Sequence, residues 1–319
     1  MISVLCTCLP IILMILIGII CRKKEILSEE GVANLKKVAL NITLPALLIS
    51  AFSKLEYSIN NIIIVVLMFI VCLLGIFLGK IFQKLFHIDS RYMPYITTGF
   101  ELGMLGYALF EMLYPGESLG YLASIDIGLT LFANTVYRMM LNKENGTRES
   151  APNKVVSDIF KSPIVIAIIT GIILGVSGIY KMLIPSGIAT VIDSCTDFFG
   201  APTGAIILLT IGYDLVLSDV PWKKVVKTIA ARVIIMAVLW IGMRFAIKAL
   251  NMMEYEHALN VVFILPAAFI LPVFADDKDE SVYISSSLSV YTILTIVAFV
   301  ILAALSVSIG TVLVGNFWQ

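Results

Sequence analysis

The chain has 319 residues, of which 60% are hydrophobic and only 14% are charged, and its formal net charge is zero. A soluble domain carries about 25% charged residues, so the composition excludes an ordinary soluble protein and indicates a membrane protein. It also excludes nucleic acid as a partner, because the sequence has no sizeable basic region that could neutralise phosphates.

Apolar segments of roughly 20 residues, the length that crosses about 30 Å of hydrocarbon as a helix, recur along the whole chain. The first is not expected to be a cleaved signal peptide, because its basic cluster follows the apolar run instead of preceding it. Together the segments predict an all-α membrane protein with ten transmembrane helices, at about residues 3–21, 31–52, 60–83, 92–113, 118–141, 160–180, 187–217, 225–249, 258–275 and 281–308.

Lysine and arginine are distributed unevenly between the two sets of loops. Four of them, Lys54, Lys181, Arg244 and Lys248, fall on one side, whereas the others, Arg232 among them, fall on the opposite side. The positive-inside rule assigns the richer side to the cytoplasm. We therefore expect a multi-pass protein of the cell membrane with both termini extracytoplasmic.

The longest polar segment, at residues 142–158, is expected to be a cytoplasmic linker between two halves of five helices, 1–141 and 159–319. Because five is an odd number, the two halves must run in opposite orientations. This is the arrangement of an inverted-topology repeat, in which a substrate site forms near the middle of the membrane where broken helices meet.

Corresponding helices of the two halves, the fourth and the ninth, both carry helix-breaking residues. The ninth contains Pro266 and Pro272, and a proline inside a helix costs about 3 kcal/mol or more. The fourth contains Gly103 and Gly106, which directly follow Glu101 and predict a loosened turn. Unwound backbone at membrane depth is tolerated only inside protein or along a cavity, so we predict that the two breaks cross. The alternative is a proline kink in one helix and close packing at glycines in the other.

Four stretches resemble the auxin efflux carrier family, which includes the PIN-FORMED proteins of plants and many bacterial carriers. The segment GIICRKKEILSEEGVANLKKVALNITLPALLISAF (18–52) is similar to the opening signature of that family. Residues 162–178, 200–215 and 265–277 are similar to its sixth, seventh and ninth helices. The resemblance implies a bacterial-type member of this family.

The sequence departs from the family pattern at the predicted breaks. Where the family reads Asn-Thr-x-x-x-Gly-x-Pro, this chain has Glu101 for the Asn, Leu102 for the Thr and Ala108 for the Pro, and it keeps Gly106. In the ninth helix, Ile270, four residues after Pro266, stands where the family has Asn. The resemblance therefore implies the fold more strongly than the substrate.

The resemblance further implies that the helices form a fixed scaffold and a moving unit. Helices one, two, six and seven would form a scaffold that joins two copies into a homodimer. Helices three to five and eight to ten would form a unit that moves by an elevator mechanism. The substrate implied is a small carboxylate, such as a dicarboxylate or an indole acid.

Two acids in the predicted helices are candidates for coupling. Burial disfavours the charged form of a carboxylic acid, so Glu101 could carry a proton, pair with a cationic group or bind a coupling ion; alternatively it lies in a wetted vestibule. Asp126, Thr130 and Asn134 follow one another at four-residue spacing and share a helix face. Asp126 could serve either structural hydrogen bonding or proton and ion coupling.

The remaining candidate substrate-binding residues are Tyr107, Phe269 and Ile270 beside the breaks, and Asn41 in the second helix. No GxSxG, HExxH or phosphate-binding glycine motif is present. The cysteines form no CxxC pair. We therefore expect no enzyme, no cofactor and no metal.

These observations predict a secondary active transporter that moves a small organic acid, with proton coupling through Glu101. Two alternatives remain open from the sequence. One is a membrane sensor that keeps the transporter fold, and the other is a carrier for an amino acid or another cationic or amphoteric solute, which could use Glu101 in its ionised form.

Overall fold

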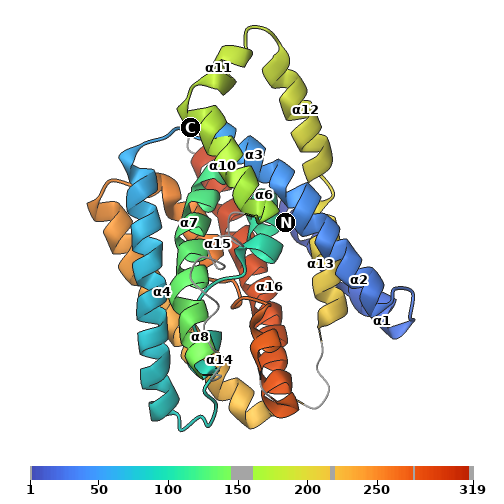
Figure 1. The fold of residues 1–319 in the computed structure, drawn as a ribbon, viewed down its shortest axis with the longest axis vertical. Helices are drawn as coiled ribbons and strands as arrows, with labels where there is room; N and C mark the ends of the chain where they lie inside the picture. The colour runs from blue at the N-terminus through green and yellow to red at the C-terminus, as the bar shows by residue number, and fades with distance from the viewer. Residues whose placement is uncertain (1, 145–160, 216–219, 276, 316–319) are drawn as a thin grey trace.

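The computed structural model describes residues 2–144, 161–215, 220–275 and 277–315, which form helices and their connections without any β-strand (Figure 1). Most of the predicted linker 142–158 lies outside these residues. Within them, six helices are long and apolar enough to cross a membrane, namely Glu29–Lys54, Ile59–Leu85, Leu119–Glu144, Ile188–Asp214, Trp222–Ala249 and Lys278–Leu305. The shorter apolar helices are Leu102–Leu113 and Pro163–Val176.

The first half of the chain contains three single turns of wider π-helix, two of them inside longer helices and one, at Leu102–Gly106, at the start of its helix. One of them directly precedes Pro45, which has no N–H to donate to the carbonyl four residues earlier. The elements of this half are α1 (Ile2–Lys23), α2 (Glu29–Val38), η1 (Ala39–Thr43), α3 (Leu44–Lys54), α4 (Ile59–Leu85), α5 (Met93–Ile96), η2 (Leu102–Gly106), α6 (Tyr107–Leu113), α7 (Leu119–Phe132), η3 (Ala133–Tyr137) and α8 (Arg138–Glu144).

In the second half, the long predicted helix at 187–217 bends at Pro202, and α11 and α12 rise above the rest of the bundle (Figure 1). The elements of this half are α10 (Pro163–Val176), α11 (Ile179–Leu183), α12 (Ile188–Gly200), α13 (Thr203–Asp214), α14 (Trp222–Ala249), η4 (Met253–Tyr255), α15 (Glu256–Val262), η5 (Leu271–Phe274) and α16 (Lys278–Gly315).

The helices pack into two groups. In the first group, α1 and α2 lie against α13, and α3 lies against α10 and α12. Glycines make these contacts close: a Cβ atom added to Gly212 would lie 2.1 Å from the carbonyl oxygen of Ile15, and one added to Gly171 would lie 2.6 Å from Cβ of Phe52. Small residues at such positions let helix backbones approach in a membrane.

The second group contains α4, α7, α14 and α16, together with the short elements between them. Here Gly128 of α7 packs on α4, where an added Cβ would lie 2.4 Å from the carbonyl oxygen of Val65. Helix α16 also contacts α1, and α6 contacts α13, so the two groups share an interface.

The fourth predicted helix is interrupted at residues 97–101, between α5 and η2. Gly99 adopts φ +70°, a left-handed conformation that favours glycine. The loosened turn predicted at Gly103 and Gly106 corresponds to the wide π-helical turn η2, with which the helix resumes, and the break in the helix lies directly before it.

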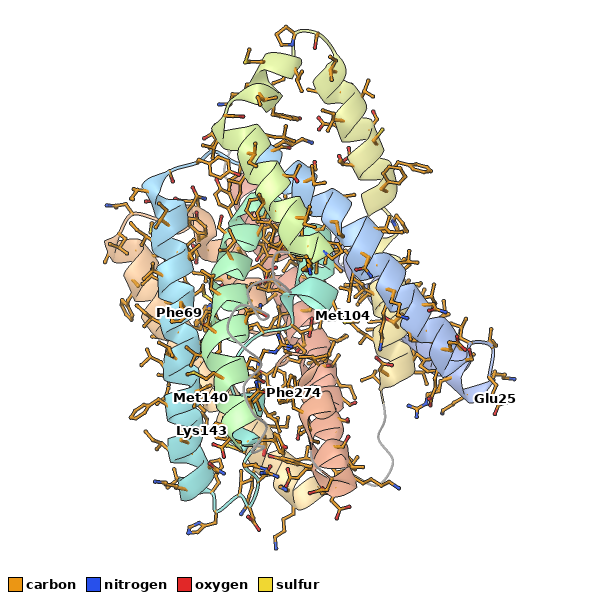
Figure 2. All side chains as sticks on the ribbon, viewed as in Figure 1. Glu25, Phe69, Met104, Met140, Lys143 and Phe274 are labelled. Carbon is orange, nitrogen blue, oxygen red and sulfur yellow. The ribbon has the colours of Figure 1, made fainter. Side chains whose placement is uncertain are left out.

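This first break lies beside the middle of α4. The hydroxyl of Thr98 donates to the carbonyl oxygen of Cys72 at 2.9 Å. A Cβ atom on Gly79 would lie 2.4 Å from Oγ1 of Thr97, so the glycine allows this approach. In Figure 2, Met104, just after the break, lies near the level of Phe69 of α4, which places the break within the depth of the bundle.

The ninth predicted helix is interrupted at residues 263–270. Helix α15 ends at Val262, four residues before Pro266. In a continuous helix the ring of Pro266 would clash with the carbonyl group of Val262, and the missing N–H of the proline would leave that carbonyl group unpaired. Pro272 was predicted as a second breaker, but it lies in the first turn of η5. Proline is tolerated there because that position needs no N–H donor.

Candidate functional site

The two breaks meet at Glu101. Its backbone N–H donates to the carbonyl oxygen of Pro266 at 2.8 Å. Its carboxylate accepts the N–H of Met104 at 3.2 Å and the N–H of Phe269 at 2.7 Å. Glu101 therefore caps the helix that resumes after the first break, and its hydrogen bond with Phe269 also fixes the backbone of the second break.

Gly106 allows this close crossing. A Cβ atom added to Gly106 would lie 2.6 Å from Cδ2 of Leu102 and 2.9 Å from Cδ1 of Leu265, which belongs to the second break. The glycine kept from the family pattern thus serves the contact between the breaks and not an unusual backbone conformation.

A small cavity of about 190 Å³ adjoins the crossing, and both candidate coupling acids line it. Asp126 is 7% exposed and accepts the hydroxyl hydrogen of Tyr107 at 3.0 Å. The hydroxyl of Thr130 lies 3.5 Å from its other oxygen. The cavity is lined in part by Glu101, Gly103, Asp126, Thr130 and Asn134.

A buried arginine supports the crossing from α14. Arg232 is 1% exposed, and its guanidinium donates to the carbonyl oxygens of Ile96 at 2.7 Å, Gly99 at 2.8 Å and Leu265 at 2.8 Å. It therefore binds carbonyl groups that both helix breaks leave without helical partners. The sequence-based assignment of Arg232 to the cytoplasmic cations was wrong, because the residue lies well inside α14.

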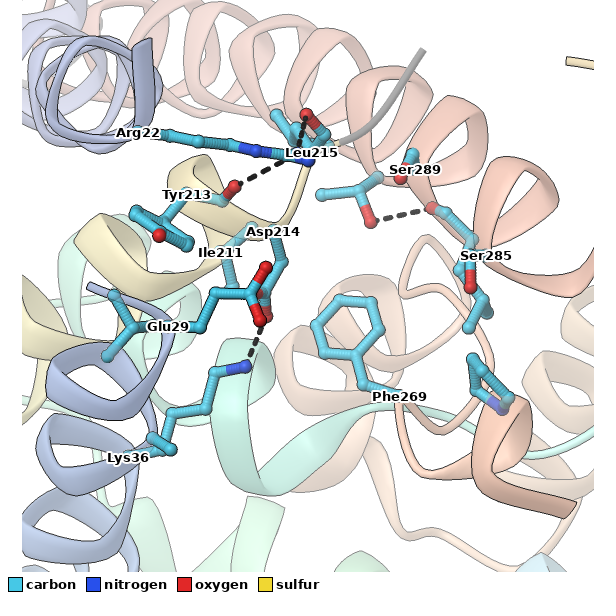
Figure 3. Close-up of a pocket in the computed structure, with 15 residues that line it drawn as sticks. Arg22, Glu29, Lys36, Ile211, Tyr213, Asp214, Leu215, Phe269, Ser285 and Ser289 are labelled. Carbon is cyan, nitrogen blue, oxygen red and sulfur yellow. Dashed lines mark hydrogen bonds and ion pairs between the residues drawn. The ribbon is translucent and has the colours of Figure 1, made fainter. Parts of the chain in front are cut away.

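A larger cavity of about 380 Å³ opens between the two helix groups. Figure 3 shows Glu29, Lys36 and Asp214 on the wall formed by the first group, where Lys36 and Asp214 form an ion pair. Phe269 and Ser285 face them from the second group. A cavity of this size fits a small organic molecule, and its mixed charges can bind either an anionic or an amphoteric one.

The sequence-predicted site residues fall into two sets. Those gathered at the crossing or its cavities are Glu101, Gly103, Gly106, Tyr107, Asp126, Pro266, Phe269 and Pro272. Two others are not brought to the cavities: Asn41 is exposed and donates its side-chain N–H to the carbonyl oxygen of Lys37 at 2.7 Å, and Ile270 is 56% exposed.

Sequence reasoning missed Arg232 and Lys36 as parts of the site. Arg232 carried a usable signal, because an arginine ten residues into an apolar helix is by default a functional residue. Lys36 had no comparable signal, since its partner Asp214 lies on another helix and only the fold brings the two together.

The comparison with known proteins agrees with the geometry. The family model described as "Membrane transport protein" matches residues 3–306, nearly the whole chain. A search of curated proteins finds no match.

Proposed function

We propose that this chain, which belongs to the auxin efflux carrier family of membrane transport proteins, is a secondary active carrier for a small organic acid. The observation that carries the proposal is the Glu101 carboxylate, which joins two broken helices beside a cavity between two helix groups. Carriers with inverted repeats bind substrate where such breaks meet.

The proposal includes the ten-helix inverted repeat. The two breaks lie in the fourth helix of each half, and the half-helix that follows the first break directs its N-terminal N–H groups toward the crossing. Helix N-termini favour negative charge. Here the Glu101 carboxylate already occupies this position, so an anionic substrate would have to be bound beside it or after Glu101 has taken up a proton.

The proposed movement is of the elevator type. The first group, with α1, α2, α3, α10, α12 and α13, would stay fixed and form the homodimer, while the second group carries the crossing past it. The larger cavity supports this division, because Lys36 and Asp214 come from the fixed group and Phe269 from the moving one. Substrate bound there would contact both groups.

Proton coupling through Glu101 forms part of the same proposal, with Asp126 as the second acid. A neutral Glu101 would remove the repulsion between its carboxylate and an anionic substrate. We expect exchange by the wild type to vary between about pH 5 and 8, a range in which buried acids can titrate, and exchange by Glu101→Gln to be flat across it. An unchanged pH profile in Glu101→Gln would remove this residue from coupling and leave Asp126 as the candidate.

The test of the proposed function has two stages. A thermal-shift screen of purified protein against organic acids, amino acids and amines identifies a stabilising compound. Counterflow of that compound, radiolabelled, into preloaded proteoliposomes then shows whether it is carried. Saturable counterflow is the expected result. Binding without counterflow would contradict a carrier and favour a membrane sensor, and stabilisation by amino acids or amines alone would replace the organic acid as substrate.

A further inference from the structure

Arg232 is held by backbone carbonyl groups from both helix breaks. Nη1 lies 2.7 Å from the carbonyl oxygen of Ile96 and 3.4 Å from that of Thr98, and Nη2 lies 2.8 Å from those of Gly99 and Leu265. Two of these oxygens, those of Thr98 and Gly99, belong to the first break, that of Ile96 ends α5 directly before it, and that of Leu265 belongs to the second break. The guanidinium therefore lies in a shell of four carbonyl oxygens at the point where the breaks cross.

No carboxylate balances this charge among the described residues, since none of their ion pairs includes Arg232. Its other neighbours are aromatic: the guanidinium carbon lies 4.8 Å from the ring centroid of Tyr291 and 6.0 Å from that of Phe100. Arginine stays charged in proteins. Carbonyl dipoles and ring faces thus stabilise a full positive charge in the interior of the bundle.

Unwound carbonyl groups of this kind are the usual ligands of a coupling cation in carriers with broken helices. We propose that the guanidinium of Arg232 is a resident cation that occupies the position of such an ion, so that transport is independent of sodium and potassium. This inference rests on the proposed function, because it concerns what drives the same crossing.

The consequence for energy coupling is direct. A tethered cation provides the carbonyl groups with hydrogen-bond donors in every state of the carrier and is released to neither side of the membrane. A gradient of sodium or potassium can then do no work through this site. Transport is then driven by the gradient of the substrate itself or by a proton gradient.

The first test needs only the wild-type protein. Its melting temperature in detergent and its initial uptake in proteoliposomes are measured in sodium, potassium and choline chloride at equal ionic strength. We expect the three salts to give the same values. Saturable stabilisation by sodium or potassium relative to choline would overturn the proposal, and this readout does not depend on whether the protein transports anything.

The second test removes the resident cation. Arg232→Ala is expected to lower the melting temperature by about 5–7 °C, and sodium or methylguanidinium should restore part of the loss in a saturable manner. Arg244→Ala, which removes an exposed arginine of the same helix, is the matched control and should not respond to these cations. An unchanged melting temperature in Arg232→Ala, or a loss that no cation restores, would overturn the proposal.

Two further variants keep the test decisive if the alanine variant does not fold. Arg232→Lys retains a tethered cation and should remain insensitive to sodium. Arg232→Met retains similar volume without charge and should be less stable than the lysine variant and be stabilised by added cations. Equal stability of the two variants would show that the positive charge is not what this position requires.

Discussion

Replacing Glu101 by alanine removes the acceptor of two backbone N–H groups, those of Met104 at 3.2 Å and Phe269 at 2.7 Å. A hydrogen bond to a charged group contributes about 1.5–3 kcal/mol net. The loss of both should therefore lower the free energy of unfolding by about 3–6 kcal/mol. For a chain of 319 residues that corresponds to a fall of about 4–9 °C in the melting temperature. Glutamine keeps one accepting oxygen, so Glu101→Gln should lose about half as much.

The assay is thermal unfolding of the purified variants in one detergent, followed by tryptophan fluorescence. Glu111→Ala is the matched control, because Glu111 is an exposed acid on the helix that follows the first break. It should melt within about 2 °C of the wild type, as surface substitutions usually do. If Glu101→Ala also melts within that range, the carboxylate does not hold the two breaks together and the reasoning from these distances is refuted.

Three further predictions concern the same region. Pro266→Ala should impair uptake at every pH, because it allows α15 to continue through the break; initial rates from about pH 5 to 8 check this. Gly79→Ala should lower the melting temperature, since its Cβ would lie 2.4 Å from Thr97, at a cost of about 1–3 kcal/mol, whereas Gly242→Ala, whose Cβ meets nothing within 4 Å, should not. Tyr107→Phe should cost about 1–3 kcal/mol by leaving a buried oxygen of Asp126 without its donor, and a thermal melt compared with the wild type measures it.

Much of the fold could be predicted because each helix carries its own signal. The apolar segments are about the length of the membrane core, and the family resemblance covers the same stretches that form helices. The break at Pro266 could also be predicted, because the missing N–H and the ring of a proline interrupt a helix whatever its surroundings.

The exact geometry of the site could not be predicted in the same way, because it depends on contacts between distant segments. Gly103 and Gly106 looked like the flexible residues of the fourth helix, but the left-handed residue is Gly99, and Gly106 instead gives room to Leu265. No local pattern indicates that the carboxylate of Glu101 binds the N–H of Phe269, 168 residues away.

Arg232 is a third case, in which the sequence did carry a signal, an arginine within an apolar segment, but the residue was used only to predict the topology. It stands among apolar residues of α14, where lipid would penalise a charge. Because Arg232 was grouped with the cations of the loops, no buried partner was predicted for it. Its partners are backbone carbonyl groups, which no sequence motif records.

The central claim is that the two helix groups move against each other during transport. Gly204 of α13 and Ala108 of α6 face each other across their interface, with Cβ positions 3.6 Å apart, within the range that a disulfide requires. A cysteine pair at these positions, in a protein without its five native cysteines, can lock the groups together.

Counterflow by this pair, measured before and after oxidation and again after reduction, tests the claim most directly. The control is a cysteine pair at Leu47 and Gly200, whose Cβ positions lie 3.8 Å apart within the first group. The account predicts that the crosslink between Ala108→Cys and Gly204→Cys abolishes counterflow reversibly, while the control crosslink leaves it intact. Undiminished counterflow in fully crosslinked Ala108→Cys/Gly204→Cys protein would contradict it.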